Sequence, residues 1–107
     1  HEEALQCLDN VLELDPRYAK AWNDKGTALV KVDRHEEALQ CFDRALAIDP
    51  RDVDAWSNKG TALEMLDRHE EALQCFDRAL AIDQKNTIAQ QGKPVAVENI
   101  RKTRSKQ

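Results

Sequence analysis

Residues Arg17–Pro50, RYAKAWNDKGTALVKVDRHEEALQCFDRALAIDP, are followed directly by Arg51–Gln84, RDVDAWSNKGTALEMLDRHEEALQCFDRALAIDQ. Each stretch is 34 residues long, and the two agree at 25 of 34 positions. Residues 1–16 repeat the second half of this unit, because they match residues 35–50 at 11 of 16 positions. The sequence therefore divides into a half unit at 1–16, whole units at 17–50 and 51–84, and a tail at 85–107.

The composition favours helices over strands. The chain has 107 residues, of which 41 % are hydrophobic and 34 % charged but only 5 % aromatic, and β-branched residues are few. No window approaches the roughly 18 apolar residues that a membrane span needs. The chain begins at His1 rather than Met and starts in mid-unit, so we expect a piece excised from a longer array.

Each unit reads as two helices. In the second half, apolar residues recur at helical spacing, at Ala38, Leu39, Phe42, Ala45, Leu46 and Ile48. The same periodicity predicts helices over residues 2–14, 17–31, 35–48, 51–65 and 69–82. The short loops between them make neighbouring helices antiparallel.

Helix-boundary signals accompany this pattern. Asp33 with Glu36 has the spacing of a capping box, which predicts Asp33 as an N-cap. The same pair recurs in the second unit as Asp67 and Glu70. Asp49 and Pro50 are expected to close one helix and to cap and open the next. Gly26 lies in mid-helix and recurs as Gly60, so we expect two helices to cross there too closely for a side chain.

The recurring residues resemble the tetratricopeptide repeat, in arrays of the prokaryotic or archaeal type. The first unit carries the pattern at Trp22, Gly26, Leu29, Ala38, Phe42, Ala45 and Pro50. The second carries it at Trp56, Gly60, Leu63, Ala72, Phe76 and Ala79. The half unit fits at Ala4, Leu8, Val11 and Pro16.

This resemblance implies an all-α fold, a right-handed α-solenoid of antiparallel helix-turn-helix repeats. It also implies a concave groove, lined by the first helix of each repeat, that binds an extended peptide or a helix of a partner protein. The pattern departs at Gln84, where Pro is expected, and beyond it Gln90 and Pro94 stand where Trp and Gly are expected.

The differences between the two units point to a recognition face. Eight of the nine mismatches fall in the first helix or directly next to it, whereas residues 33–49 and 67–83 are identical. A stacking surface has to repeat, but a surface that binds a non-periodic ligand does not. Neutral drift between duplicated units is the alternative explanation. We expect the ligand-binding residues to be Lys20, Asn23, Thr27, Val30, Lys31, Asp54, Ser57, Asn58, Thr61, Glu64 and Met65.

A subset of the family holds the C-terminal carboxylate of chaperones with Lys, Asn and Arg on successive first helices. Asn58 matches one of these positions, but Asn23, Thr27, Ile88 and Gly92 stand where Lys, Asn, Lys and Arg are needed. A frame shifted by one unit places Asp24 and Asp54 there, and Asp repels a carboxylate. We therefore do not expect this chain to bind chaperone tails.

No catalytic or metal-binding constellation stands out in the sequence. The recurring HEEAL lacks the second His of a zinc-protease motif. Residues one repeat apart lie too far from one another to share a metal ion, and this applies to His1, His35 and His69. We expect these histidines to be exposed in the first turn of a helix. We expect Trp22 and Trp56 to pack in the core. The chain is predicted not to be an enzyme and to need no cofactor or metal.

The same spacing keeps Cys7, Cys41 and Cys75 too far apart for disulfides. They are predicted to be small, partly buried side chains, and three unpaired thiols favour a cytoplasmic protein.

The tail differs in charge from the body. Residues 84–107 hold six Lys or Arg and one acid, a net charge of +5, so with −4 overall residues 1–83 carry −9. Gly92–Pro94 is predicted to break the tail, with a short turn at 87–91 and a helix over 95–104. Three roles stay open for the tail. It can form a helix that covers the last repeat and then frays, or it can dock onto the acidic body of another copy. The third role is contact with nucleic acid, which four basic residues at one end support only weakly.

The predicted function is that of a non-catalytic protein-interaction module. The alternative is a structural spacer or self-assembly element within a longer protein, which the periodicity supports equally. Residues 2–14 would form a second helix without its first-helix partner, leaving Leu5, Leu8 and Leu12 partly uncovered. We therefore expect copies of the chain to associate through this helix and the basic tail. We expect no membrane partner.

Overall fold

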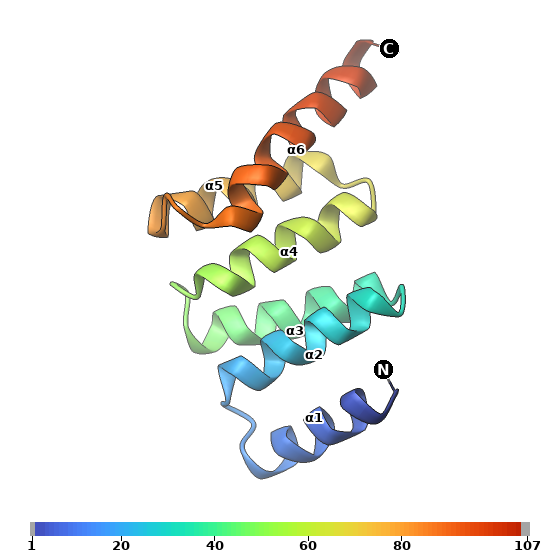
Figure 1. The fold of residues 1–107 in the computed structure, drawn as a ribbon, viewed down its shortest axis with the longest axis vertical. Helices are drawn as coiled ribbons and strands as arrows, with labels where there is room; N and C mark the ends of the chain where they lie inside the picture. The colour runs from blue at the N-terminus through green and yellow to red at the C-terminus, as the bar shows by residue number, and fades with distance from the viewer. Residues whose placement is uncertain (1, 106–107) are drawn as a thin grey trace.

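The computed structural model describes residues 2–105, which form an open stack of helices measuring 48 × 27 × 19 Å (Figure 1). The described residues contain no strand, so the prediction of an all-α repeat fold is confirmed. In chain order the helices are α1 (Glu2–Leu14), α2 (Ala19–Lys31), α3 (His35–Ile48), α4 (Val53–Met65), α5 (His69–Ile82) and α6 (Thr87–Ser105). In Figure 1, α2, α4 and α6 lie in front of α3 and α5. Among residues 2–105, none of the helices combines the length and apolar character that a membrane crossing requires.

The first helix of each repeat begins two residues later than the sequence predicted. Asp49 does not cap α4: it ends α3, and its Oδ1 accepts from the backbone N–H of Arg51 in the turn that follows. The N-cap of α4 is Asp52, whose Oδ1 accepts a hydrogen bond from the N–H of Ala55. Pro50 therefore belongs to the turn between the repeats rather than to the first turn of the helix.

The capping boxes predicted at Asp33 and Asp67 are not formed. The N-caps of α3 and α5 are Arg34 and Arg68, and neither makes a side-chain capping bond. Asp33 and Asp67 instead have φ values of 62° and 58°. They provide the left-handed residue that ends the preceding helix, a conformation that Asp tolerates better than most residues.

A Phe ring packed on a Gly backbone holds each pair of helices together. Phe42 and Phe76 are 0 % and 1 % exposed. A Cβ added to Gly26 would lie 2.5 Å from Cε1 of Phe42, and one added to Gly60 would lie 2.6 Å from Cε1 of Phe76. The expected close crossing at these glycines is therefore confirmed.

The two tryptophans are packed at the ends of the first helices. The Nε1–H of Trp22 donates to the carbonyl of Pro16, and that of Trp56 to the carbonyl of Pro50, both at 2.8 Å. Two cations also lie over each ring, a Lys of its own helix at 5.7 Å and an Arg of the next helix at 5.5 Å from the ring centroid. This packing matches the structural role predicted for them.

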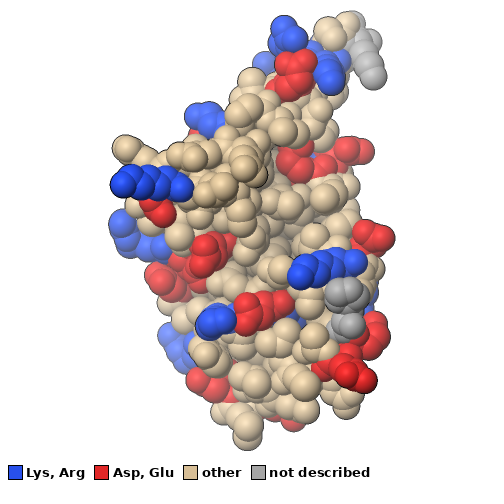
Figure 2. Space-filling model, viewed as in Figure 1, with Lys and Arg blue, Asp and Glu red and all other residues tan. Residues whose placement is uncertain are grey.

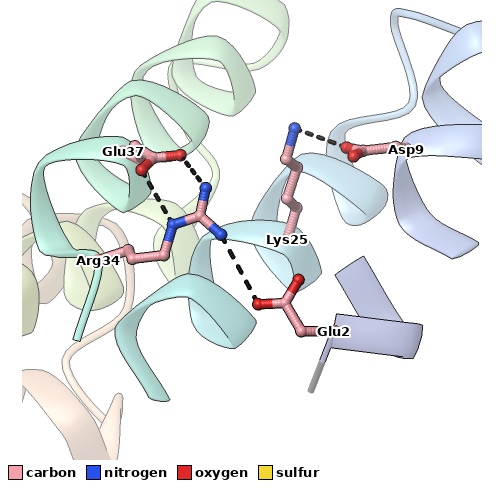
Figure 3. Close-up of polar contacts among 5 residues, drawn as sticks. All are labelled: Glu2, Asp9, Lys25, Arg34 and Glu37. Carbon is pink, nitrogen blue, oxygen red and sulfur yellow. Dashed lines mark hydrogen bonds and ion pairs between the residues drawn. The ribbon is translucent and has the colours of Figure 1, made fainter. Parts of the chain in front are cut away.

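A repeating set of ion pairs links the helices. Lys25 on α2 reaches Asp9 on α1 at 2.6 Å, and Arg34 lies between Glu37 and Glu2 (Figure 3). Arg34 donates two hydrogen bonds to Glu37, at 2.9 and 2.6 Å, and these bonds lower the pKa of Glu37 and raise that of Arg34. The Lys–Asp pair recurs as Lys59–Asp43 and Lys93–Asp77. The Arg–Glu contact across repeats recurs as Arg68–Glu36.

The tail forms one continuous helix, so the predicted break at Gly92–Pro94 is wrong. Packing of α6 on α4 and α5 outweighs the cost of Pro94 inside the helix, since Ala89 and Ala96 on either side of it are 0 % exposed. The repeat register also continues. Gln90 takes the place of the tryptophan, and its amide donates to the carbonyl of Gln84 at 2.7 Å as Trp56 does to Pro50. Residues from 87 onward therefore act as a further first helix.

We predict that Gly60→Ala destabilises the fold by about 1–2 kcal/mol, because the new methyl group clashes with Phe76 and outweighs the better helix propensity of Ala. The double variant Gly60→Ala/Phe76→Leu should be less destabilised than the sum of the two single variants, because Leu vacates the space. Urea unfolding of the four proteins measures this double-mutant cycle. Additive losses would contradict a direct contact.

We predict that Asp67→Gly stabilises the fold by about 0.5–1 kcal/mol, because glycine relieves the positive φ at this position at a smaller cost in chain entropy. Asp67→Val should instead destabilise it, since a β-branched residue is strained there. Thermal unfolding of both variants checks the prediction. Equal effects of the two substitutions would contradict a backbone origin.

Candidate protein-interaction surface

The outward sides of α2, α4 and α6 form one surface, which we call the first-helix face. These three helices contact one another in succession and lie toward the viewer in Figure 1. Figure 2, drawn from the same side, shows acidic and basic side chains scattered among larger uncharged areas. Because the helices share one register, equivalent residues of this face recur every 34 positions, at Lys20, Asp54 and Ile88, at Thr27, Thr61 and Val95, and at Lys31, Met65 and Asn99.

The predicted binding residues differ in how far they are open to solvent. Lys20, Lys31, Asp54 and Met65 are exposed, and Met65 is 60 % exposed. The half-buried members are Thr27, Val30, Asn58 and Thr61. Lys20 pairs with Asp24 one turn along α2 at 3.4 Å, but both side chains are more than half exposed, so a ligand can replace this contact at little cost.

Two of the predicted binding residues are buried inside the stack, which corrects their assignment. Asn23 is 9 % exposed, and its Nδ2 donates to Oδ2 of Asp52 at 2.7 Å. Ser57 is 0 % exposed, and its Oγ donates to the carbonyl of Asp54. These positions differ between the repeats because they make different contacts within the chain. Sequence variation alone could not separate this cause from ligand binding.

Glu64 is held by a polar network rather than left open. Its Oε1 lies 2.8 Å from Nδ1 of His69, and its Oε2 accepts from Nδ2 of Asn99 at 2.9 Å. The counterpart of Glu64 in the first repeat is Val30, and among the described residues Nδ1 of His35 there is buried without a hydrogen-bond partner. Glu64, near the end of α4, therefore links Asn99 on α6 to His69 at the start of α5.

The histidines of the two whole repeats are less exposed than predicted. The side chains of His35 and His69 are 15 % and 16 % exposed, because each lies under the turn that precedes its helix. His1 lies outside the described residues. Residues 2–105 contain no group of three or more His, Cys, Asp or Glu side chains placed to hold a metal ion.

Helix α6 contributes two exposed apolar residues to the first-helix face that are not among the predicted binding residues. Ile88 is 41 % exposed and Val95 is 52 % exposed, and they extend the face beyond Asp54 and Thr61. The 34-residue register, counted on from those two residues, was the signal that could have found them. The apparent break at Pro94 concealed it.

A hollow of about 460 Å³ opens between α1 and α2. Thr27 and Lys31 line one side of it, and Ala4, Cys7 and Leu8 line the other. Two of the predicted binding residues therefore border a hollow that the half repeat helps to form.

The cysteines fall into two classes. Cys41 and Cys75 are each 4 % exposed, and burial raises the pKa of both thiols to about 11. Cys7 is exposed. Thiolate is the reactive form of cysteine, so the two buried thiols are inert near neutral pH.

A sequence model described as tetratricopeptide repeat matches residues 1–51 and 23–87, and so covers most of the chain. The chain belongs to the tetratricopeptide repeat family. The comparison with curated protein sequences found no match.

Solved tetratricopeptide repeat domains share the fold. The first such domain of human RPAP3 has a TM-score of 0.93 at 20 % identity, over 97 % of this chain and 82 % of that one. The domain of Arabidopsis OM64 has a TM-score of 0.85 at 25 % identity, over 89 % and 78 %. The first domain of Spaghetti (RPAP3), bound to the HSP90 peptide SRMEEVD, has a TM-score of 0.90 at 21 % identity, over 92 % and 79 %.

We predict that a thiol reagent at neutral pH and low micromolar protein modifies Cys7 alone in the native protein. Cys41 and Cys75 should react only after unfolding, because they are buried and protonated. Their raised pKa contributes stability that is fully present below the ordinary thiol pKa and is lost as the pH rises through about 11. Mass spectrometry of the labelled chain counts the modified sites. Three thiols reacting at one rate would contradict the burial.

Proposed function

We propose that this tetratricopeptide repeat chain is a non-catalytic interaction module that binds an extended segment of a partner protein on its first-helix face. The observation that carries the proposal is the contrast between the helices of the two repeats. The second helices are identical, whereas the exposed residues of the first helices differ in charge and polarity, as at Lys20 and Asp54 or at Lys31 and Met65. Two domains with this fold were solved in complex with peptides of HSP90 and HSP70, which supports peptide binding as the function.

The chemistry of the face describes the ligand that fits it. Lys20 and Lys31 make the α2 end basic, Asp54 makes the middle acidic, and Ile88 and Val95 make the α6 end apolar. A complementary segment carries an acidic, a basic and an apolar group in that order along the stack. The half-buried Thr27, Asn58 and Thr61 can contribute hydrogen bonds, although Thr61 Oγ1 also donates to the carbonyl of Ser57.

Chaperone tails do not fit this description. The peptides in two of the related structures end in EEVD. Here Asn23 is buried, Asp24 and Asp54 present negative charge, and Ile88 and Gly92 offer no cation for a terminal carboxylate. The peptide SRMEEVD is therefore the matched negative control for any ligand of this chain.

The test is selection of binders from a random peptide library on the immobilised chain, followed by calorimetric titration. We predict that Lys20→Ala/Lys31→Ala weakens a selected peptide by at least tenfold, because each lost charge contact contributes about 1 kcal/mol. Gln40→Ala, an exposed change on a second helix, should leave the affinity unchanged. Equal affinity for both variants, with the fold intact by circular dichroism, would place the ligand elsewhere.

A structural spacer within a longer protein is the second candidate, and the identity of residues 33–49 with 67–83 favours it. A spacer predicts that no library peptide is enriched on the first-helix face. We further propose a cytoplasmic setting, on the ground that the chain carries three free cysteines.

A further inference from the structure

A small hollow of about 260 Å³, which we call the Trp56 hollow, opens between α4 and α5. Seven residues of these two helices line it: Trp56, Lys59, Leu63, Glu71, Gln74, Cys75 and Arg78. None of them belongs to the first-helix face. Both helices lie inside the stack, where α4 packs on α3 and α5 packs on α6. The hollow is therefore a feature of one complete hairpin with neighbours on both sides.

The buried part of the Trp56 hollow is apolar. Leu63 and Cys75 are 1 % and 4 % exposed, and the indole of Trp56 is half-buried beside them. The Nε1–H of Trp56 already donates to the carbonyl of Pro50, so the indole offers a ligand a carbon surface rather than a hydrogen bond. The hollow has room for one side chain, because pockets that enclose whole small molecules measure roughly 300–1,000 Å³.

The charges around the Trp56 hollow leave one cation without a counterion. Lys59 is paired with an aspartate of α3 at 2.7 Å, and Glu71 accepts two hydrogen bonds from Arg68. Arg78 is exposed, lies 5.5 Å from the centroid of the Trp56 ring and forms no ion pair among residues 2–105. An Arg guanidinium binds a carboxylate through two parallel N–H donors. The hollow therefore offers a free positive charge beside an apolar wall.

The first repeat carries the same seven residue types in the same order. The residues 34 positions earlier are Trp22, Lys25, Leu29, Glu37, Gln40, Cys41 and Arg44. Lys25 and Arg44 lie 5.7 and 5.5 Å from the centroid of Trp22, the distances also found in the second repeat. In the described part of the chain Arg44 likewise forms no ion pair. The arrangement of an indole beside an unpaired arginine therefore occurs twice, one repeat apart.

We propose that the Trp56 hollow, and its copy around Trp22, each bind an acidic side chain followed by an aromatic one in a segment of a partner protein. The carboxylate accepts hydrogen bonds from the guanidinium of Arg78, and the aromatic ring packs on Trp56 and Leu63. An aromatic residue fits better than an aliphatic one, because aromatic rings gain from pairing with an indole beyond the area they bury. The site is separate from the first-helix face and does not depend on the function proposed for that face.

The first experiment titrates the blocked dipeptide acetyl-Asp-Phe-amide into the ¹⁵N-labelled chain. The chain has two tryptophans, so their two indole N–H resonances report the two sites separately. Both resonances should shift and saturate together, because the sites are alike. The control probe acetyl-Asn-Phe-amide has the same shape without the charge and should bind about tenfold more weakly, because it lacks the charge-assisted contact with arginine. Absence of any shift, or equal binding of the two probes, would overturn the proposal.

Substitution of the unpaired arginines locates the contact. In Arg78→Gln the Trp56 resonance should lose most of its response while the Trp22 resonance still saturates, and Arg44→Gln should give the reverse pattern. Arg101→Gln removes an exposed arginine of α6, so it is the matched control and should respond like the parent. A Trp56 response in Arg78→Gln equal to that of the parent, with the fold intact by circular dichroism, would overturn the assignment.

The repetition of the site gives an independent test. Two Asp-Phe pairs joined by a flexible Gly-Ser linker should bind the parent about tenfold or more tighter than one pair, because the second contact forms at a high effective concentration. Arg44→Gln should abolish this gain, whereas Lys20→Ala/Lys31→Ala should leave every titration unchanged. The proposal for the first-helix face and this one therefore fail separately. A linked peptide that binds no tighter than one pair at any linker length would overturn the paired sites.

Discussion

The close approach of a Phe ring to a Gly backbone sets the geometry on which the rest of the stack depends. Gly26 and Gly60 give up helix propensity so that the rings of Phe42 and Phe76 can reach the neighbouring backbone. At the interface of α5 and α6, where Phe76 lies against Gly92, Lys93 also reaches Asp77 at 2.8 Å. Phe76 lies against both Gly60 and Gly92, so one ring joins three helices.

The sequence was a good guide wherever a contact repeats. Period and apolar spacing predicted α1 to α5 and the close crossing at the glycines, and the family resemblance predicted the packing of the tryptophans, which are partly buried. Local rules failed where packing between helices decides the outcome. Asp33 has the spacing of a capping box, but it adopts the left-handed conformation of the turn and does not cap α3. Pro94 would break an isolated helix, but α6 packs on α4 and α5 and stays helical through it.

The candidate site could be predicted only in part, because variation between repeats has two causes. Lys20, Lys31, Asp54 and Met65 differ and are exposed, as a ligand-binding surface requires. Asn23 also differs between the repeats, yet its difference reflects a hydrogen bond to Asp52 between neighbouring repeats. Separating these causes requires knowing which side of a helix is covered, and that depends on the next helix in space.

The nearest-neighbour pattern of contacts has a kinetic consequence. Among the described residues, a helix contacts only the next helix in the chain or the one after it. Closing such short loops costs little entropy, so native contacts can form before the distant parts of the chain are present. A growing chain can therefore begin to fold as soon as one hairpin and its neighbour have left the ribosome, and each later hairpin adds to a template already in place.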